Sequence, residues 1–313
     1  MNQNYPRRDP YNQVARIRQT QPIETFQAVR IKTPKQKRRR GTCLIPLLLM
    51  LTVGCLVSMV FFLVLPTPVN FVVMGIDRAP EGTALGRSDT IIMVTVQPLK
   101  PYVGMLSVPR DLWVQIPGVG ENRINTAHFF AEGNVAGSGP QALLDTITTN
   151  FGVQIPYYIR FKFEGFKGVV NALGGVDITL DKATGGYDPG THHLDGDQAL
   201  AFVRDRAGSD DFFRMERGQI FVKAVAKQML NPLNWARLPV VVPVLLANID
   251  TNLPVWQWPR LGAAVLRIGI DGIDNHTVNR DYVTPFVTNE GAQVLGPRWE
   301  VIWPLVQEMF AIH

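Results

Sequence analysis

The sequence predicts an α/β (α+β) sandwich, with a central mixed β-sheet flanked by helices, preceded by one N-terminal transmembrane helix. Three observations predict it. An uncharged apolar run occupies residues 43–65. Beyond it, short runs rich in β-branched residues are separated by turn residues, as in neighbouring strands. From residue 126 onwards, helical patterns and further strands follow in an irregular order, which favours a mixed sheet over a doubly wound one.

The run CLIPLLLMLTVGCLVSMVFFLVL, residues 43–65, decides the architecture. As a helix it would be roughly 34 Å long at 1.5 Å per residue, enough to cross a hydrocarbon core of about 30 Å. The alternatives are a buried core helix and a cleaved signal peptide, but a signal h-region is shorter and no Ala-x-Ala-like site follows. We therefore predict an uncleaved anchor that ends before Pro66. The chain's two cysteines, Cys43 and Cys55, lie in this run, so the rest offers no disulfide framework.

Net charge divides the chain on either side of this run. Residues 1–40 hold eleven basic and two acidic residues, whereas residues 77–313 hold twenty basic and twenty-four acidic ones. By the positive-inside rule, residues 1–42 are predicted to form a basic, disordered cytoplasmic tail, and residues 66–313 an extracytoplasmic domain of a single-pass protein of the cell membrane. Attraction of the tail to anionic lipid headgroups of the bilayer is expected, and no nucleic-acid partner is expected.

Within residues 66–313, four strands are expected before the first helix. A second group of strands and helices leads to a long helix near residue 214, and three apolar helical stretches complete the domain. The tryptophans of these last stretches, Trp256, Trp258, Trp299 and Trp303, are predicted to serve packing. The expected strands are 70–76, 90–98, 101–109, 112–118, 157–163 and 176–180, and the expected helices are 127–133, 139–152, 164–175, 194–204 with Asp195 as N-cap, 214–230, 236–248, 255–268 and 298–311.

Two acidic residues bracket the connection between the first two strands. Asp77 follows the first strand and Asp89 precedes the second, so neighbouring strands would bring both carboxylates to one end of the sheet. Carboxylate oxygens suit Mg²⁺, or alternatively Mn²⁺, and Mg²⁺ needs only one or two protein carboxylates because it keeps several waters. The alternative is that both are ordinary strand-end residues paired with Arg78 and Arg87.

Arginines gather at two further places. Arg110 and Asp111 follow the third strand, and Arg123 is expected to open the first helix. An arginine beside a helix start complements the backbone N–H groups that attract anions there. The alternative for Arg110 is an ordinary salt bridge to Asp111.

The densest cluster is RDRAGSDDFFRMER, residues 204–217. Arg214 and Arg217 are three apart and share a helix face, while Arg204 and Arg206 end the preceding helix and can face them. Guanidinium groups bind phosphate oxygens in bidentate fashion, and the neighbouring acids would orient them or bind metal. The alternative is a solvated charged loop.

Seven motifs occur in order within about residues 70–230: FVVMGIDR, GRSDT, LSVPRD, RINTAH, LGGVDI, LDGDQALAFVRDR and DDFFRMER. Together they resemble the LytR-CpsA-Psr family of bacterial envelope proteins, in which a basic tail and one anchor precede an external catalytic domain. The resemblance implies a phosphotransferase that moves a glycopolymer from a polyprenyl-pyrophosphate carrier onto peptidoglycan and leaves a phosphodiester link. Its partners would be the lipid-linked glycan, the peptidoglycan acceptor and the bilayer.

The resemblance also implies roles for single residues. Mg²⁺-binding aspartates fall on Asp77 and Asp89. The candidate catalytic residues are Arg110, Asp111 and Asp211, and the general base is left open between the two aspartates. The chain departs from the family at Gly218, where glutamine is usual, and Gln219 is the expected substitute. The residues expected to contact the pyrophosphate are Arg87, Arg110, Arg123 (where lysine is usual), Arg204, Arg206, Arg214, Arg217 and Gln219.

Two other functions compete with the ligase. In one, water is the normal acceptor and the protein is a lipid pyrophosphatase, an activity that is also expected as a side reaction of the ligase. In the other, the domain binds polyprenyl pyrophosphate without turnover and acts as a sensor or attenuator through its cytoplasmic tail. A DNA-reading regulator needs a helix-turn-helix, for which residues 1–40 are too short and too often interrupted by proline. His128 is expected to be a packed helix residue rather than a base.

Overall fold

The computed structural model describes residues 44–64, 67–77, 84–97, 101–205 and 211–310. The predicted tail, residues 1–42, lies outside these residues, as does Arg206. The chain divides into two units, residues 1–53 and residues 54–313. The described part of the first unit belongs to an apolar helix, α1 (Leu44–Val64).

In the described residues, no single helix has both the length and the apolar character needed to cross a membrane. The apolar stretch Leu48–Val60 is shorter than required, and the helices Phe212–Leu230 and Pro232–Asn248 have the necessary length and composition only as a pair bent by 80°.

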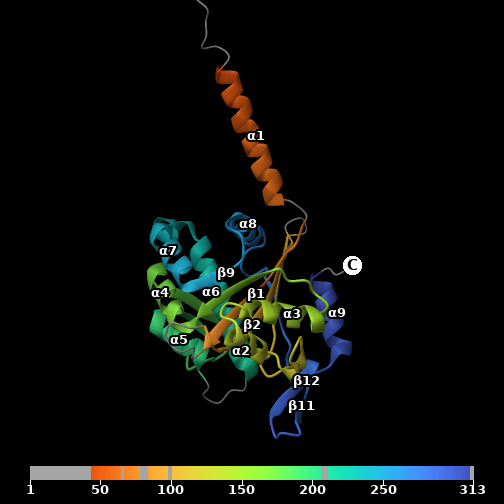
Figure 1. Cartoon of the computed structure of the whole chain (residues 1–313). Coiled ribbons are helices and arrows are strands. Elements are labelled where there is room, and N and C mark those ends of the chain that lie inside the picture. Colours follow the sequence, from red (N-terminus) through yellow and green to blue (C-terminus); the bar gives the residue numbers. More distant parts are fainter. Residues whose placement is uncertain (1–43, 65–66, 78–83, 98–100, 206–210, 311–313) are drawn as a thin grey trace, which may run out of the picture. The chain divides into compact units, whose positions relative to one another are not determined.

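A six-stranded mixed sheet forms the centre of the second unit, in the order β10-β3-β2-β1-β6-β9. β1 runs antiparallel to β2 and parallel to β6, and β10 runs parallel to β3. The predicted mixed sheet flanked by helices is therefore confirmed (Figure 1). The strands are β1 (Val69–Asp77), β2 (Arg87–Gln97), β3 (Tyr102–Ser107), β6 (Tyr157–Lys162), β9 (Ile249–Thr251) and β10 (Asp274–Thr277).

The central strands contain continuous apolar runs because both faces of the sheet are covered. Successive side chains of a strand point to opposite faces. In β1, Val72 and Met74 join one core, whereas Phe71 and Val73 join another. The first core is closed by α2 (Asn125–Asn134), α3 (Gly139–Phe151) and α9 (Trp299–Phe310).

The opposite face of the sheet carries α8 (Trp258–Ile268) and α6 (Asp211–Leu230). A third core lies beyond, where the far side of α6 meets three more helices and a two-stranded ribbon. Figure 1 shows α4, α5 and α7 on one side of the sheet and α3 and α9 on the other. These elements are α4 (Phe163–Leu173), α5 (Gly196–Arg204), α7 (Leu238–Asn248), β7 (Val176–Leu180) and β8 (Gly190–Leu194).

Most predicted elements occur where the periodicity placed them, and the expected N-cap Asp195 forms a full capping box with Gln198. The prediction that Arg123 opens a helix was wrong, because Arg123 ends β5, and α2 begins at Asn125. Short polar strands escaped prediction because they lack apolar alternation. The elements not yet named are β4 (Trp113–Ile116), β5 (Gly120–Arg123), β11 (Val283–Val287), β12 (Gln293–Pro297), and the 3₁₀ helices η2 (Pro232–Arg237), η3 (Val255–Gln257) and η4 (Arg280–Tyr282).

The four C-terminal tryptophans do not all serve packing. Trp299 packs edge-on against Phe151, with 5.2 Å between ring centroids, and Trp258 packs against the core under α8. Trp256, in contrast, is 63% exposed, and Trp303 is 47% exposed although it stacks on Trp299. The packing prediction was therefore wrong for Trp256, which lies in the short helix η3 on the surface.

Candidate functional site

The candidate site begins at the end of β1 and the start of β2. These strands are neighbours, and Asp77 lies opposite Arg87 in their register. The register then shifts, so that Ile76 pairs with Ser88 and Gly75 with Thr90, which leaves Asp89 as the extra residue of a β-bulge. A bulge bends its strand and redirects a side chain. The side chain of Asp77 is outside the described part of the structure, so its predicted meeting with Asp89 stays a prediction.

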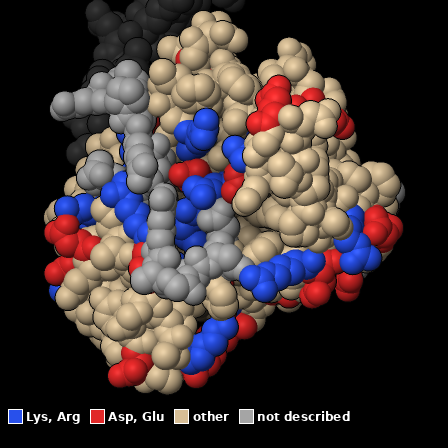
Figure 2. Space-filling view, turned by 90° about the horizontal axis from the view of Figure 1, so that it is seen from below, with Lys and Arg blue, Asp and Glu red and all other residues tan. Residues whose placement is uncertain are grey.

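A cavity of about 630 Å³ opens beside this bulge. Five predicted site residues line it, although they come from three separate segments of the chain. Figure 2 shows Lys and Arg side chains gathered around a few acidic ones on one face of the molecule. The cavity lining comprises Leu85, Gly86, Arg87, Asp89, Arg110, Asp111, Arg123, Asn125, Phe129 and Gln293.

Alternating charges connect the two sides of this cavity. Arg110 Nη1 lies 3.3 Å from Asp89 Oδ1, and Arg110 Nε lies 3.4 Å from Asp111 Oδ2. The other oxygen of Asp111 lies 3.2 Å from Arg123 Nε. Asp111 therefore holds two guanidinium groups, each of which carries five N–H donors. The Arg110–Asp111 salt bridge that was expected as the alternative is present. Both residues also line the cavity, so the salt bridge does not exclude a role in the site.

Backbone hydrogen bonds fix Arg110 and Asp111 in place. The Arg110 carbonyl accepts from Asn125 N at 3.3 Å, and the Asp111 carbonyl accepts from Leu295 N at 3.1 Å. The turn after β3 is thus tied to the start of α2 and to β12. Arg123 is tied to β12 as well, because its Nη2 donates to the Gln293 carbonyl at 2.9 Å.

Five residues of the cavity lining escaped the sequence analysis as site residues: Leu85, Gly86, Asn125, Phe129 and Gln293. Phe129 lies beneath the Arg87 guanidinium, 5.9 Å from the ring centroid. Asn125 is 3% exposed, and its Oδ1 has no hydrogen-bond partner among the described residues. A buried amide oxygen without a partner costs free energy. The motif RIN pointed to Asn125, but only the fold shows that its side chain lines the cavity.

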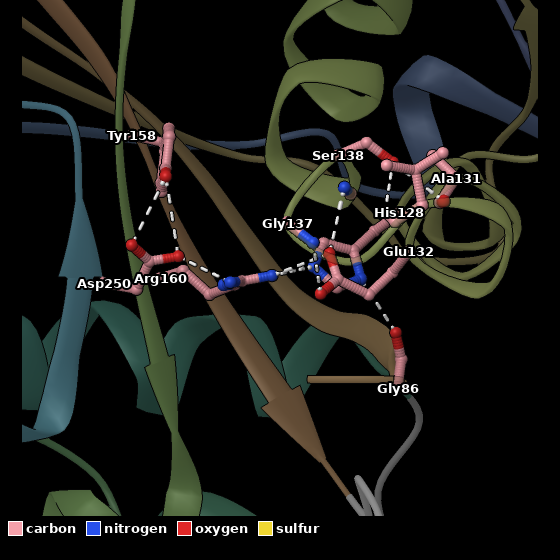
Figure 3. Close-up of polar contacts among 11 residues, drawn as sticks. Gly86, His128, Ala131, Glu132, Gly137, Ser138, Tyr158, Arg160 and Asp250 are labelled. Atoms are coloured by element: carbon pink, nitrogen blue, oxygen red, sulfur yellow. Dashed lines mark hydrogen bonds and ion pairs between the residues drawn. The ribbon is translucent and has the colours of Figure 1, made fainter. Parts of the chain in front are cut away.

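A buried polar network supports the cavity from behind (Figure 3). His128 Nδ1 donates to the Gly86 carbonyl at 2.9 Å, and its Nε2 accepts from Arg160 Nη1 at 3.1 Å. Because a carbonyl can only accept, the Nδ1-protonated neutral imidazole satisfies both contacts. Burial lowers the pKa of His128, which also favours the neutral ring. The prediction that His128 is a packed helix residue is confirmed.

Glu132 and Arg160 complete this network. Burial opposes ionisation of Glu132, but hydrogen bonds from Gly137 N and Gly139 N, together with the Arg160 charge, outweigh burial and lower its pKa. Arg160 Nη1 lies 3.0 Å from Glu132 Oε2, and its Nη2 pairs with Asp250 on β9. The network therefore joins α2, β6 and β9, and holds Gly86 immediately before Arg87.

The predicted site residues of α5 and α6 are not part of the described cavity lining. None of the described residues that line the cavity comes from these helices. Arg217 is 2% exposed and its Nη2 donates to the Asp205 carbonyl, and its expected contact with pyrophosphate stays a prediction. The contacts of Arg204 and Arg214 with pyrophosphate stay predictions, and the side chain of Asp211 lies outside the described residues.

Gln219 lines a second hollow, of about 550 Å³, where its Nε2 donates to the His276 carbonyl at 2.7 Å. A third hollow, of about 510 Å³ and largely apolar, lies between the two. It shares Asp111 and Gln293 with the main cavity and Phe212 with the second hollow. The three hollows therefore adjoin along one surface, and Gln219 is at the end away from Arg110.

Comparison with known proteins agrees with this geometry. The sequence model of the LytR_cpsA_psr family matches residues 65–300. The polyisoprenyl-teichoic acid–peptidoglycan teichoic acid transferase TagU of Oceanobacillus iheyensis is 36% identical over 191 residues, and the regulatory protein MsrR of Staphylococcus aureus is 31% identical over 194 residues. Each match covers 59% of this chain, and 59% and 57% of the two relatives. The chain thus spans about three fifths of the length of the curated relatives it matches.

Solved structures share the fold. TagV of B. subtilis has a TM-score of 0.65 at 25% identity and covers 79% of this chain and 99% of its own. A structure of TagT bound to LI-WTA has a TM-score of 0.60 at 23% identity, with 78% and 91% covered. The likeness to TagT at this identity shows the fold alone. The family match, in contrast, spans most of the sequence, and the protein belongs to the LytR_cpsA_psr family.

Proposed function

We propose that this protein is a membrane-anchored phosphotransferase that moves a glycopolymer from a polyprenyl-pyrophosphate carrier onto peptidoglycan. One observation supports this most directly: Arg87, Arg110 and Arg123 meet Asp89 and Asp111 in a single open cavity. A pyrophosphate diester is a compact anion that bidentate guanidinium groups suit. The names of the TagU relatives, teichoic acid transferases acting on polyisoprenyl-linked polymer and peptidoglycan, agree with this substrate class.

The reaction needs in-line displacement at phosphorus. A hydroxyl oxygen of the acceptor forms a bond to the phosphorus that bears the glycopolymer, and the bond from that phosphorus to the bridging oxygen breaks. Polyprenyl phosphate leaves, and the hydroxyl proton passes to a base. The enzyme's contribution is to place both reactants and to stabilise the charge on the leaving phosphate. Arg110 and Arg123, held by Asp111, are oriented before substrate arrives, which is the condition for electrostatic stabilisation without reorganisation.

We further propose a Mg²⁺ site beside Asp89. The described residues contain no group of three or more His, Cys, Asp or Glu side chains that could hold a metal. Mg²⁺, however, needs only one or two carboxylates because it keeps several waters. Asp89 and the backbone position of Asp77 opposite Arg87 suit such a site, as does Asn125 Oδ1, which has no hydrogen-bond partner within the described part of the chain. When bound there, the ion would supply charge neutralisation at the phosphate oxygens.

The two base candidates are now unequal. Both oxygens of Asp111 are engaged by guanidinium groups, so we assign it to orienting Arg110 and Arg123. Asp211, at the start of α6, remains the proposed base. Replacement of Asp111 by Asn should then lower turnover by mispositioning the arginines. Replacement of Asp211 by Asn should remove the ascending, acid-side limb of the pH–rate profile, because a general base acts in its deprotonated form.

Membrane anchoring is also part of the proposal. The apolar run of residues 43–65 extends beyond the helical stretch Leu48–Val60 at both ends. A basic segment precedes it, so we place residues 1–42 in the cytoplasm and the folded domain outside. The anchor would hold the domain beside its lipid-linked substrate.

A regulatory function is the second candidate, because the relative MsrR is named a regulatory protein. The test is incubation of the full chain in detergent micelles with a polyprenyl-pyrophosphate glycan and Mg²⁺, with and without peptidoglycan oligomers. Glycan attached to the oligomer through a phosphodiester supports the ligase. Phosphorylated glycan in solution, regardless of acceptor, indicates a pyrophosphatase, and unchanged lipid that stays bound indicates the sensor.

A further inference from the structure

An exposed apolar surface at one end of the domain has no role in the cavity. Helix α7, LPVVVPVLLAN, carries no charged side chain, yet Val241 is its only buried residue among those described. A helix that is apolar on every face is normally buried or in contact with lipid. One side of α7 packs on α4 through Val241, Val244 and Leu245, and the rest faces outward.

The 3₁₀ helices that precede α7 and α8 extend this surface. Large apolar side chains are exposed on these 3₁₀ helices and on α7 and α8. Helices α7 and α8 lie at the same end of the domain (Figure 1). We call this set the apolar end: Leu233 (88% exposed), Trp235 (52%), Val240 (61%), Val242 (40%), Leu246 (50%), Val255 (73%), Trp256 (63%) and Leu266 (58%).

The charged residues of the segment that carries the apolar end are mostly arginines, although Arg260 is buried. Residues 231–268 contain three arginines and one acidic residue, Asp250. Asp250 is 48% exposed and pairs with Arg160. Exposed tryptophans with apolar neighbours and arginine are the composition of segments that lie in a membrane interface. Anionic headgroups complement such a surface, whereas an acidic rim would repel them.

Chain length limits how far the apolar end can be from the proposed anchor. Arg260, which is 3% exposed in α8, donates from Nη2 to the Thr67 carbonyl at 2.8 Å. Thr67 follows Val64, the last residue of α1, by three positions. Three peptide units span at most about 11 Å. If α1 crosses the bilayer, α8 is therefore held within a short distance of its surface, whatever path the intervening residues take.

We infer that the apolar end docks on the outer surface of the bilayer, with the side chains of α7, η2 and η3 in the headgroup and upper acyl region. This inference rests on the proposed anchoring of α1. It gives the lipid-linked substrate a fixed approach, because the domain then cannot rotate freely about its anchor. A second copy of the chain, or α1 itself, would be the competing occupants of the same surface.

The test uses the full chain reconstituted in vesicles of phosphatidylcholine and phosphatidylglycerol whose acyl chains are brominated near the headgroup. Bromine quenches tryptophan fluorescence only at contact range. Trp235→Phe with Trp256→Phe should remove about half or more of the quenching, because these rings are expected to lie about 5–10 Å deep in the interface. The matched control is Trp303→Phe, which removes an exposed tryptophan of α9 (47%) and should leave the fluorescence intensity lost to quenching unchanged.

Equal quenching in the double variant and in the unaltered chain overturns the docking. Flotation of the vesicles after an alkaline wash separates this result from failure of the anchor. Protein that floats but whose Trp235 and Trp256 are not quenched is anchored with its apolar end covered by protein. Protein that stays at the bottom of the gradient lacks the anchor, and the inference falls with it.

Discussion

Two arginine clusters lie next to the same short segment, residues 85–89, and differ in burial. In the cavity, the side chains of Arg110, Asp111 and Arg123 are 24–29% exposed and form ion pairs of 3.2–3.4 Å. Behind it, Arg160 and Glu132 are 11% and 5% exposed, and Glu132 accepts from two backbone N–H groups as well. The same residue types thus form an open cluster suited to an anion in the cavity, and a closed buried network around Arg160, Glu132 and His128. What separates them is whether the guanidinium groups still face a solvent-filled space.

Substitution in the buried network should lower the unfolding free energy most strongly. Arg160→Leu removes the partner of Glu132 and His128 and leaves a buried carboxylate unpaired. Breaking a buried pair in this way costs about 3–5 kcal/mol of unfolding free energy. Chemical denaturation of the variant measures it, with Arg298→Ala, at an exposed pair with Glu300, as the control that should change little. A loss of unfolding free energy below about 1 kcal/mol for Arg160→Leu would show that the buried cluster contributes no more to stability than partly exposed ion pairs do.

The cavity should show the opposite response. Arg110→Ala is expected to lower turnover on the order of 10²–10³-fold, because a preorganised donor to the leaving phosphate is lost. Its unfolding free energy should fall by no more than about 1 kcal/mol, since the lost ion pairs are partly exposed. Transfer assays and denaturation on the same preparation check both halves. Unchanged turnover would contradict the proposed site, even if the variant folds normally.

Acid should lower the stability that the buried network of His128, Glu132 and Arg160 contributes, within a defined pH window. The folded-state pKa of His128 is lowered by burial, so the unfolded chain binds a proton first as the pH falls below about 6.5. Stability should then decline towards the folded-state pKa, by at most about 1.4 kcal/mol per pH unit. The pKa of Glu132 is lowered too, and its contribution is lost only at lower pH, below about 4.5.

His128→Gln isolates this effect. Its unfolding free energy, measured from pH 7 to pH 5, should vary less with pH than that of the unaltered chain. A slope equal to that of the unaltered chain would show that other groups cause the decline.

The smallest effect is expected at Gly218, in α6 beside the buried Arg217. A Cβ placed there meets no atom within 4 Å. Gly218→Ala should therefore stabilise the domain by up to about 1 kcal/mol, through helix propensity alone. If turnover stays constant while the melting temperature rises, position 218 affects only the stability of the domain and not the substrate site. Restored glutamine, Gly218→Gln, should raise turnover only if this part of α6 contacts the substrate.

Sequence periodicity was sufficient for the central elements but not for the site as a whole. The apolar strands β1, β2 and β3 and the amphipathic helices carry their burial pattern in their residues, which is why their positions could be predicted. Arg217 could not be distinguished from Arg214 in this way, because both lie on one helix, and only packing against Asp205 shows that Arg217 is buried. Gln219 lines a neighbouring hollow, and its expected contact with pyrophosphate stays a prediction.

By itself, the sequence determined the apolar run, the mixed sheet, and the motifs that place Asp89, Arg110 and Asp111 at strand ends, because these follow from local order along the chain. Tertiary structure decided the rest. Pairing of β2 with β3, the bulge at Asp89 and the link from the Asn125 N–H to the Arg110 carbonyl brought Arg87, Asp89, Arg110, Asp111 and Arg123 around one cavity, together with Asn125 and Gln293. It also buried Arg160 and left Trp256 exposed. The physical reason is that burial depends on contacts between residues far apart in the chain, which no local pattern records.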